Sequence, residues 1–217
     1  MSKYKLAIFD MDGTILYTLD DINNAVNETL RAFDLPEVTL EETRRNVGNG
    51  LRKTMERSLK TEVSEEKFQE IFAYMLKVYE AHSNDYTRPY DGVCEMIMKI
   101  REAGLQTAVI SNKKDSAVKK LCRVFFEGLF DYEYGERENV RLKPYPDTIY
   151  ELADMGTPLE EMVYIGDSDV DVATARNAGV DCVAVTWGFR DEAFLIEQGA
   201  KNIAHTPEEM YELVVHG

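Results

Sequence analysis

The sequence predicts an α/β protein with a Rossmann-like parallel sheet, helices on both faces, and a small α-helical domain inserted after the first strand. A short apolar run over residues 6–9 ends abruptly in a polar turn, and residues 15–86 carry helical patterns with no strand-like run. From residue 88 onward, strand-like and helix-like segments alternate, which is typical of a parallel sheet covered by helices. We therefore expect a core domain of residues 1–14 and 87–217 and a helical domain of residues 15–86.

The helical domain carries clear helix-start signals. Thr39 and Glu42 have capping-box spacing, and Ser64 precedes two glutamates that favour a helix N-terminus. The second of these helices has apolar residues at three- and four-residue spacing, namely Phe68, Ile71, Phe72, Met75, Leu76 and Tyr79. Residues 46–51 (NVGNGL) hold two glycines, so this segment is either a helix–helix turn or a hinge or substrate-facing loop.

The rest of the core domain is expected to alternate between helices and strands. Glycines 104, 156 and 179 are placed to end helices, and Thr206, Pro207 and Glu209 are placed to begin the last one with a capping box. The expected helices are 92–103, a segment around 118–125, 148–155, a segment ending near 178, and a last helix from 206. The expected strands are 106–110, 132–134, 162–165, 182–186 and, more weakly, 202–204.

Composition limits the classes of partner. The 217 residues are 44% hydrophobic, as in ordinary globular proteins, and 40 acidic against 25 basic residues give a formal charge of −15. This charge opposes binding to nucleic acid or to an anionic membrane surface. The first apolar run is too short for a signal sequence, and no later stretch could span a bilayer. Cys94, Cys122 and Cys182 lie in apolar surroundings, so we expect buried thiols and a cytoplasmic protein.

Polar side chains follow several predicted strands at the point where each strand ends. Asp10 and Asp12 follow the first strand, Ser111 and Asn112 follow another, and Asp167 follows a third. Carboxyl ends of parallel strands meet at one edge of the sheet, and Lys143 lies in a loop that could reach this edge. Each residue alone has an ordinary explanation, such as a turn, a helix cap, a solvated cation or the acidic first turn that Asp169 and Asp171 would form. Together they indicate a reaction centre.

The residue types indicate phosphoryl transfer. The carboxylates of Asp10 and Asp167, with the Asp12 carbonyl, are the oxygen ligands that Mg²⁺ prefers. Ser111 and Lys143 supply donors and positive charge for an anion. Once the phosphoryl charge is neutralised, Asp10 could attack as a nucleophile, and Asp12 could act as general acid and then base.

Four motifs match, in order, those of the haloacid dehalogenase-like hydrolase superfamily. They are Asp10–Thr14 (DMDGT), Ser111, Lys143-Pro144 and the segment 166–171 (GDSDVD). The helical insert resembles the small cap domain of that superfamily. Within the superfamily, NVGNGL, ISNK (110–113), GEREN (135–139) and VTWG (185–188) resemble the phosphoglycolate phosphatase group. The chain differs in having Tyr17 where family members often have an acid.

The resemblance implies a Mg²⁺-dependent phosphatase that hydrolyses a small phosphomonoester, 2-phosphoglycolate first among them, through an aspartyl phosphate on Asp10. Asp12 would be the acid/base, and Ser111, Asn112 and Lys143 would bind the substrate. Asp10, Asp12 and Asp167 would hold the metal, with Asp171 in an outer-shell or supporting role. The cap would choose the leaving group. Four basic residues beside the glycine loop could meet a substrate carboxylate, although a solvated helix face explains most of them: Arg44, Arg45, Arg52 and Lys53.

Other functions remain open at this point. A pyrophosphatase, a sugar-phosphate or nucleotide phosphatase, and a β-phosphoglucomutase-like phosphomutase would use the same motifs, and a receiver-like phospho-acceptor module gathers similar residues. A dehalogenase would have no use for Asp12 as acid/base or for a metal. Phosphate-binding glycine loops of nucleotide-binding proteins are absent from the sequence, and its three histidines are isolated. The expected partner is a small phosphorylated metabolite, and the chain is expected to be a monomer or homodimer.

Overall fold

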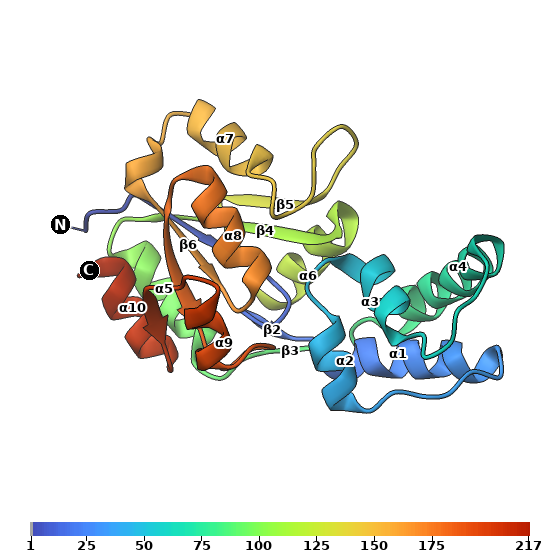
Figure 1. Cartoon of the computed structure of the whole chain (residues 1–217). Helices are drawn as coiled ribbons and strands as arrows, with labels where there is room; N and C mark the ends of the chain where they lie inside the picture. Colours follow the sequence, from blue (N-terminus) through green and yellow to red (C-terminus); the bar gives the residue numbers. More distant parts are fainter. Residues whose placement is uncertain (1) are drawn as a thin grey trace. The chain divides into compact units, whose positions relative to one another are not determined.

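The computed structural model describes residues 2–217 and divides into two compact units (Figure 1). One is an α/β unit formed by the chain up to Leu16 and again from Pro89 onward, and the other is a helical unit, Tyr17–Arg88. The helical unit begins two residues later than the sequence suggests, at Tyr17, and also ends two residues later, at Arg88. Two very short strands, β2 (Leu16–Tyr17) and β3 (Arg88–Pro89), pair at these borders.

The α/β unit is built on a six-stranded sheet in the order β5-β4-β1-β6-β7-β8. All of its recorded strand pairings are parallel, so the prediction of a parallel α/β fold is confirmed. The strands are β1 (Leu6–Phe9), β4 (Gln106–Lys114), β5 (Tyr132–Glu136), β6 (Met162–Gly166), β7 (Asp181–Val185) and β8 (Asn202–Ala204). The strand β1 lies inside the sheet between β4 and β6. Its carboxyl end is therefore in the middle of the row formed by the carboxyl ends of the strands.

Helices cover both faces of this sheet (Figure 1). In β1, Ala7 and Phe9 join the core on one face, whereas Leu6 and Ile8 join the core on the other. All four side chains are buried, which explains why this strand is continuously apolar and does not alternate with polar residues. The first face carries α5 (Val93–Glu102), α6 (Asp115–Phe125) and α10 (Pro207–Val215), and the second carries α7 (Asp147–Asp154), α8 (Asp169–Ala178) and α9 (Glu192–Glu197).

Two parts of the α/β unit differ from the sequence prediction. Strand β4 continues to Lys114, so Ser111 lies within the strand and not after it, and the pairing with β5 shifts register between Ile110 and Lys114. Polar residues prolong this strand because the neighbouring β5 still offers backbone partners there. Helix α9 and a short 3₁₀ helix at Leu159–Glu161 were not predicted, since both are too short to show a period.

The capping box predicted for the last helix is half formed. The Thr206 hydroxyl accepts a hydrogen bond from the Glu209 amide, as expected, and Pro207 occupies the first turn. The Glu209 carboxylate accepts from the amide of His205 at 2.7 Å, one residue before the N-cap. The helix still begins where the sequence predicts, because the Thr206 half of the box satisfies an amide of the first turn.

The helical unit contains four helices, and the two predicted starts are confirmed. Thr39 and Glu42 form a complete capping box, and the Ser64 hydroxyl accepts from the amide of Lys67. The helices are α1 (Leu19–Ala32), α2 (Leu40–Asn46), α3 (Gly50–Ser58) and α4 (Glu65–His82). Residues 47–49 alone separate α2 from α3, so the glycine segment forms a short turn between two helices. Across residues 2–217, the helices lack either the length or the apolar character needed to cross a membrane.

A buried acid ties the end of the helical unit to its first helix. Asp21 on α1 is 2% exposed and accepts hydrogen bonds from the amides of Tyr86 and Thr87, at 3.0 and 2.8 Å. The Thr87 hydroxyl donates to the same carboxylate at 2.7 Å. The chain that leaves α4 is thereby fixed against the chain that enters α1.

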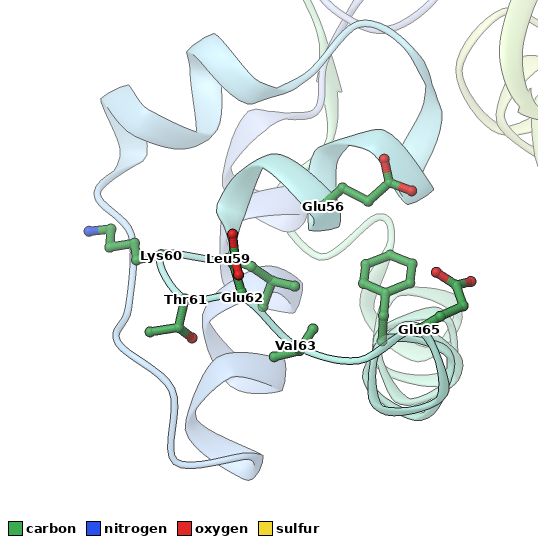
Figure 2. A pocket seen from close by; sticks show the side chains of 8 residues that line it. Glu56, Leu59, Lys60, Thr61, Glu62, Val63 and Glu65 are labelled. Atoms are coloured by element: carbon green, nitrogen blue, oxygen red, sulfur yellow. The ribbon is translucent and has the colours of Figure 1, made fainter.

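The basic residues beside the glycine turn are paired within the helical unit. Arg44 and Arg45 contact Glu41, while Arg52 and Lys53 contact Glu56. An open pocket of about 410 Å³ is lined in part by Glu56, the partner of Arg52 and Lys53 (Figure 2). Its lining consists of Glu56, Leu59, Lys60, Thr61, Glu62, Val63, Glu65 and Phe68. The pairs favour the interpretation of these cations as part of a solvated, ion-paired helix surface.

The three cysteines are free thiols in the structure. Cys122 is buried as expected, whereas Cys94 and Cys182 are partly exposed, so the prediction of three buried thiols is correct only for Cys122. Burial raises the pKa of the Cys122 thiol far above its usual value, with a smaller contribution from Glu133. This thiol is therefore unreactive at neutral pH.

Candidate active site

The turn after β1 positions the first two aspartates. The Asp10 amide donates to the Ile165 carbonyl at 2.8 Å, which extends the pairing with β6 by one residue. The Met11 carbonyl then accepts from the amides of Ile15 and Leu16, closing a tight turn. Gly13 occupies this turn with φ of 89°, a conformation that other residues rarely adopt.

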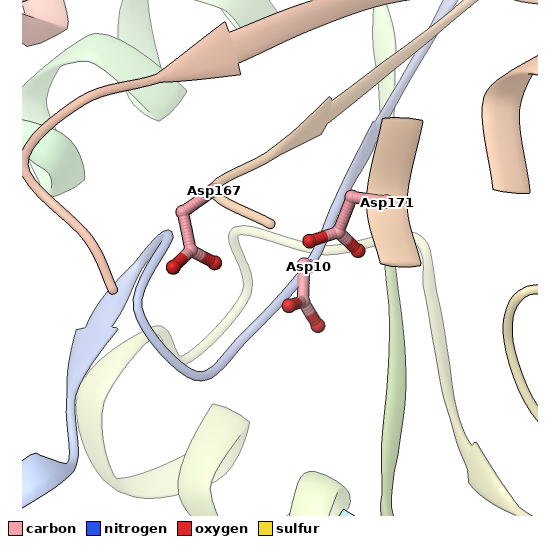
Figure 3. A group of neighbouring side chains, drawn as sticks. All are labelled: Asp10, Asp167 and Asp171. Carbon is pink, nitrogen blue, oxygen red and sulfur yellow. The ribbon is translucent and has the colours of Figure 1, made fainter. Parts of the chain in front are cut away.

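Three buried carboxylates meet beside this turn. One carboxylate oxygen from each of Asp10, Asp167 and Asp171 lies within 4.8 Å of the other two, and Figure 3 shows the three side chains as close neighbours. Asp10 follows β1, Asp167 follows the neighbouring β6, and Asp171 lies in the first turn of α8. The convergence of Asp10 and Asp167 agrees with the sequence prediction. The structure also places Asp171 directly in the group, although only an outer or supporting role was expected for it.

Lys143 places a buried positive charge between two of these acids. Its Nζ lies 2.6 Å from Oδ1 of Asp10 and 2.8 Å from Oδ1 of Asp171. Burial lowers the pKa of this ammonium, but the charges of Asp10 and Asp171 outweigh burial and hold the pKa well above its ordinary value. Burial, followed by the charge of Asp171, raises the pKa of Asp10 well above the usual range, and Lys143 opposes that rise.

Asp167 is held by one hydrogen bond on each carboxylate oxygen. The Thr14 hydroxyl donates to Oδ1 at 3.1 Å, and the amide of Phe189 donates to Oδ2 at 2.7 Å. Burial, and then the nearby charge of Asp171, raise the pKa of Asp167 to about 7. Its orientation is therefore fixed, while both oxygens keep a further lone pair.

The residues of this group fit a divalent cation. Three buried carboxylates with one ammonium between them carry excess negative charge, and burying such charge without compensation is unfavourable. Carboxylate oxygens are suitable ligands for hard divalent ions. A cation bound here would offset the repulsion that raises the pKa values of Asp10 and Asp167. Asp10, Asp167 and Asp171 are therefore the residues that could hold it.

Asp12 lies outside the three-carboxylate group and contacts a second lysine. Its Oδ1 is 3.2 Å from Nζ of Lys113, whose side chain is 5% exposed. Asp12 itself is more accessible, with 22% of its side chain exposed. No role was predicted for Lys113 from the sequence. It lies two residues beyond Ser111, in the part of β4 where the register with β5 shifts.

Ser111 and Asn112 take different partners. Ser111 Oγ accepts a hydrogen bond from the amide of Lys113 at 3.2 Å, which leaves the hydroxyl proton to donate elsewhere. The Asn112 carboxamide bonds the backbone of Lys143 twice, accepting from its amide at 2.8 Å and donating to its carbonyl at 3.1 Å. Ser111 thus keeps a donor for an anion, whereas Asn112 positions Lys143.

The fold is that of an α/β protein, and its candidate site gathers carboxylates at the ends of β1 and β6 and in the first turn of α8. The family model for haloacid dehalogenase-like hydrolases matches residues 7–185. This range includes most of β1 and nearly all of the residues described in the site. The chain therefore belongs to the haloacid dehalogenase-like hydrolase family, and the prediction of a hydrolase is confirmed.

Similar proteins show which group within this family the chain resembles. The chain is 31% identical over 192 residues to phosphoglycolate phosphatase 1 of Pseudomonas aeruginosa, covering 85% of this chain and 70% of that protein. It is 28% identical to phosphoglycolate phosphatase of Aquifex aeolicus, covering 85% and 86%. A solved structure from Lactobacillus delbrueckii, of a candidate phosphoglycolate phosphatase, superposes with a TM-score of 0.93 at 32% identity, covering 99% of this chain and 100% of that one. The predicted resemblance to this group is confirmed.

Proposed function

We propose that the protein is a Mg²⁺-dependent phosphatase that hydrolyses a small phosphomonoester through an aspartyl phosphate on Asp10. The observation that carries this proposal is the buried group of Asp10, Asp167 and Asp171 with Lys143 between two of its members. Magnesium would be held by these three carboxylates, with the Asp12 carbonyl as a further oxygen ligand, and would neutralise charge on the phosphoryl group. Lys143 and Ser111 bind the same group through an ammonium and a hydroxyl.

In the first step, a carboxylate oxygen of Asp10 attacks phosphorus and the bond to the leaving oxygen breaks. Asp12 donates its proton to that oxygen, so the substrate alcohol departs neutral. Asp12 suits this role because it lies two residues after the nucleophile and remains partly accessible. Lys143 is already within hydrogen-bond distance of Asp10 and stays paired with Asp171, so a positive charge faces the developing phosphoryl charge throughout.

In the second step, water attacks the phosphorus of the aspartyl phosphate. Asp12, now ionised, takes a proton from that water, and the acyl phosphate bond breaks to restore the Asp10 carboxylate and release phosphate. The same side chain thus serves as acid and then as base. Both steps use residues of the α/β unit alone.

We propose 2-phosphoglycolate as the preferred substrate, because the similar curated proteins carry the name phosphoglycolate phosphatase. The helical unit is proposed as the cap domain that selects the leaving group. Pyrophosphate, sugar phosphates and nucleotides share the same phosphoryl chemistry and are the competing substrates. A phosphomutase is the second enzyme class, because it would use the same residues and differ only in where the phosphoryl group goes next.

The test is phosphate release from 2-phosphoglycolate, pyrophosphate, sugar phosphates and nucleotides, with Mg²⁺ or with EDTA. We compare wild type with Asp10→Asn, and we use Asp154→Asn as a matched control because Asp154 is exposed at the end of α7. We expect release that requires Mg²⁺, is greatest for 2-phosphoglycolate, is abolished in Asp10→Asn and is unchanged in Asp154→Asn.

Other outcomes would redirect the assignment. Release that is greatest for another substrate would keep the phosphatase and replace the substrate. Phosphoryl retention on a sugar would indicate a mutase. If no substrate yields phosphate or a transferred phosphoryl group, the proposed function is wrong, and a receiver-like module that keeps its phosphoryl group becomes the explanation.

A further inference from the structure

The segment after β7 lies against the catalytic turn at two points. The indole Nε1 of Trp187 donates to the carbonyl of Thr14 at 2.9 Å, and the amide of Phe189 donates to Oδ2 of Asp167 at 2.7 Å. Residues 187–189, which we call the buttress segment, therefore contact both the turn after β1 and the carboxylate after β6. The proposed binding and catalytic steps assign no role to this segment.

Gly188 allows this contact. A Cβ atom at Gly188 would lie 2.3 Å from the carbonyl oxygen of Gly13 and 2.4 Å from both Cβ and Oδ2 of Asp167. These distances are far shorter than real contacts of a Cβ atom, so a side chain here would displace the turn, the carboxylate or both. The φ angle of Gly188 is not positive, so packing alone requires the glycine.

Asp167 has little freedom in this arrangement. A Cβ atom at Gly13 would also lie 2.4 Å from Oδ2 of Asp167, so two glycine backbones lie close to the same carboxylate. Rotating the carboxylate away would break its hydrogen bonds to Thr14 and Phe189 in a fully buried setting. Leaving either donor without a partner in this buried setting is unfavourable. The packing and the hydrogen bonds thus act together to hold one orientation.

We propose that the buttress segment positions Asp167 for cation binding and links it to the turn that carries Asp10 and Asp12. The proposal rests on the proposed function, since it concerns the same Mg²⁺ site. Contacts that orient a metal ligand typically change metal affinity by about 10- to 100-fold when they are lost. Trp187 is the single tryptophan of the chain, so its fluorescence reports on the carbonyl of Thr14 at the edge of the site.

The experiment measures Mg²⁺ binding directly, by calorimetry and by Trp187 fluorescence, without substrate. The main variant is Gly188→Ala. The control is Gly128→Ala, because Gly128 has φ of 74° and a Cβ atom there would meet nothing within 4 Å, so alanine strains the backbone without touching the site. Asp167→Asn serves to show that the signal arises at this site, because it removes one proposed ligand.

We expect Gly188→Ala to weaken Mg²⁺ binding at least about tenfold, while Gly128→Ala lowers the thermal midpoint and leaves Mg²⁺ binding unchanged. Asp167→Asn should abolish the fluorescence response. If Gly188→Ala does not fold, Trp187→Phe keeps an aromatic ring and removes the indole donor together with part of the ring volume. For that variant we expect Mg²⁺ binding to be weaker by about fivefold, because one hydrogen bond is lost. Calorimetry measures this affinity.

Two results contradict the proposal, and they differ in meaning. Wild-type affinity in Gly188→Ala, or in Trp187→Phe where the glycine variant does not fold, would show that the buttress segment does not position the ligand. In that case wild type still binds Mg²⁺ and the proposed function stands. If wild type itself binds no Mg²⁺, the metal part of the proposed function fails and the positioning role fails with it.

Discussion

The two units of the molecule bury acidic side chains in opposite ways. In the helical unit, Asp21 is 2% exposed and accepts hydrogen bonds from two amides and one hydroxyl. In the α/β unit, Asp10, Asp167 and Asp171 are also buried but face one another, with one lysine between two of them. Burial alone therefore does not separate a structural acid from a functional one, whereas the balance of donors and charges does.

This contrast has a simple physical basis. A buried carboxylate that is fully hydrogen-bonded stabilises the fold, and removing it leaves donors without partners. Buried carboxylates that repel one another oppose folding until a cation compensates their charge. The contrast predicts that removing an acid from the helical unit lowers stability and spares the chemistry, and that removing one from the site has the reverse effect.

After the loss of activity expected for Asp10→Asn, the largest effect is expected for Asp12→Asn. An amide cannot deliver or take the proton, so we expect kcat on the preferred phosphomonoester to fall by about 10²–10⁴-fold, the usual contribution of a general acid or base. Because Asp12 is partly exposed and the amide oxygen of asparagine can still accept from Lys113, the free energy of unfolding should change little. Steady-state kinetics and urea denaturation of the same preparation measure both quantities. A loss of kcat of no more than about threefold is far smaller than the contribution of a general acid or base. Such a result would exclude Asp12 as the acid/base.

The next effect concerns the helical unit. Asp21→Ala leaves the amides of Tyr86 and Thr87 and the Thr87 hydroxyl without their acceptor, so we expect a loss of about 3 kcal/mol in unfolding free energy. Glu28→Ala is the matched control, because Glu28 is exposed on the same helix. Urea denaturation followed by circular dichroism measures the difference. Equal stability of the two variants would show that Asp21 does not stabilise the helical unit.

The smallest expected effect is that of Asp167→Asn, which should raise the unfolding free energy where Asp21→Ala lowers it. Without metal, burial and the charge of Asp171 raise the pKa of Asp167 to about 7, above its unfolded value of 3.8. Stability is therefore lost as pH rises between these two values, and at pH 8 the ionised carboxylate opposes folding. In Asp167→Asn, the amide oxygen can accept from the Phe189 amide while the amide nitrogen donates to the Thr14 hydroxyl oxygen, so both neighbours can keep a partner.

We expect Asp167→Asn to raise the unfolding free energy of the metal-free protein at pH 8 by about 1 kcal/mol, the usual size of a single-substitution effect. The variant should also lose the stabilisation that Mg²⁺ gives to wild type, because one proposed ligand is gone. Thermal unfolding with EDTA and with Mg²⁺ measures both. A lower midpoint in EDTA would mean that the hydrogen bonds of Asp167 outweigh its repulsion.

The sequence predicts the parts of this site that local pattern determines. Asp10 and Asp167 each follow a strand as predicted, because an apolar run beside an acid and a glycine is visible in a single window; that the two strands are neighbours is shown by the structure. The helix starts at Thr39 and Ser64 are predictable for the same reason, since a cap needs only residues four or fewer apart.

What the sequence missed depends on distant partners. The continuation of β4 through Ser111 follows from the backbone of β5, and the place of Lys113 beside Asp12 follows from that continuation. The contact of Phe189 with Asp167 joins segments that are separated by a helix and a strand. The pattern VTWG is visible as a family resemblance, but nothing in its spacing shows which atoms it contacts.

The place of β1 in the sheet also has a consequence for how the protein folds. Ile8 pairs with Ala108 on one side and with Tyr164 on the other, so a ribosome makes this strand long before either neighbour exists. All residues of the helical unit are synthesised before β4 emerges, so they can fold while β1 has no neighbouring strand to pair with. Closing such long loops slows folding, and a bare apolar strand favours aggregation during the wait. The segment that carries Asp10, the proposed nucleophile, is thus the first strand of the sheet to be synthesised, and it gains its second neighbour only when β6 emerges.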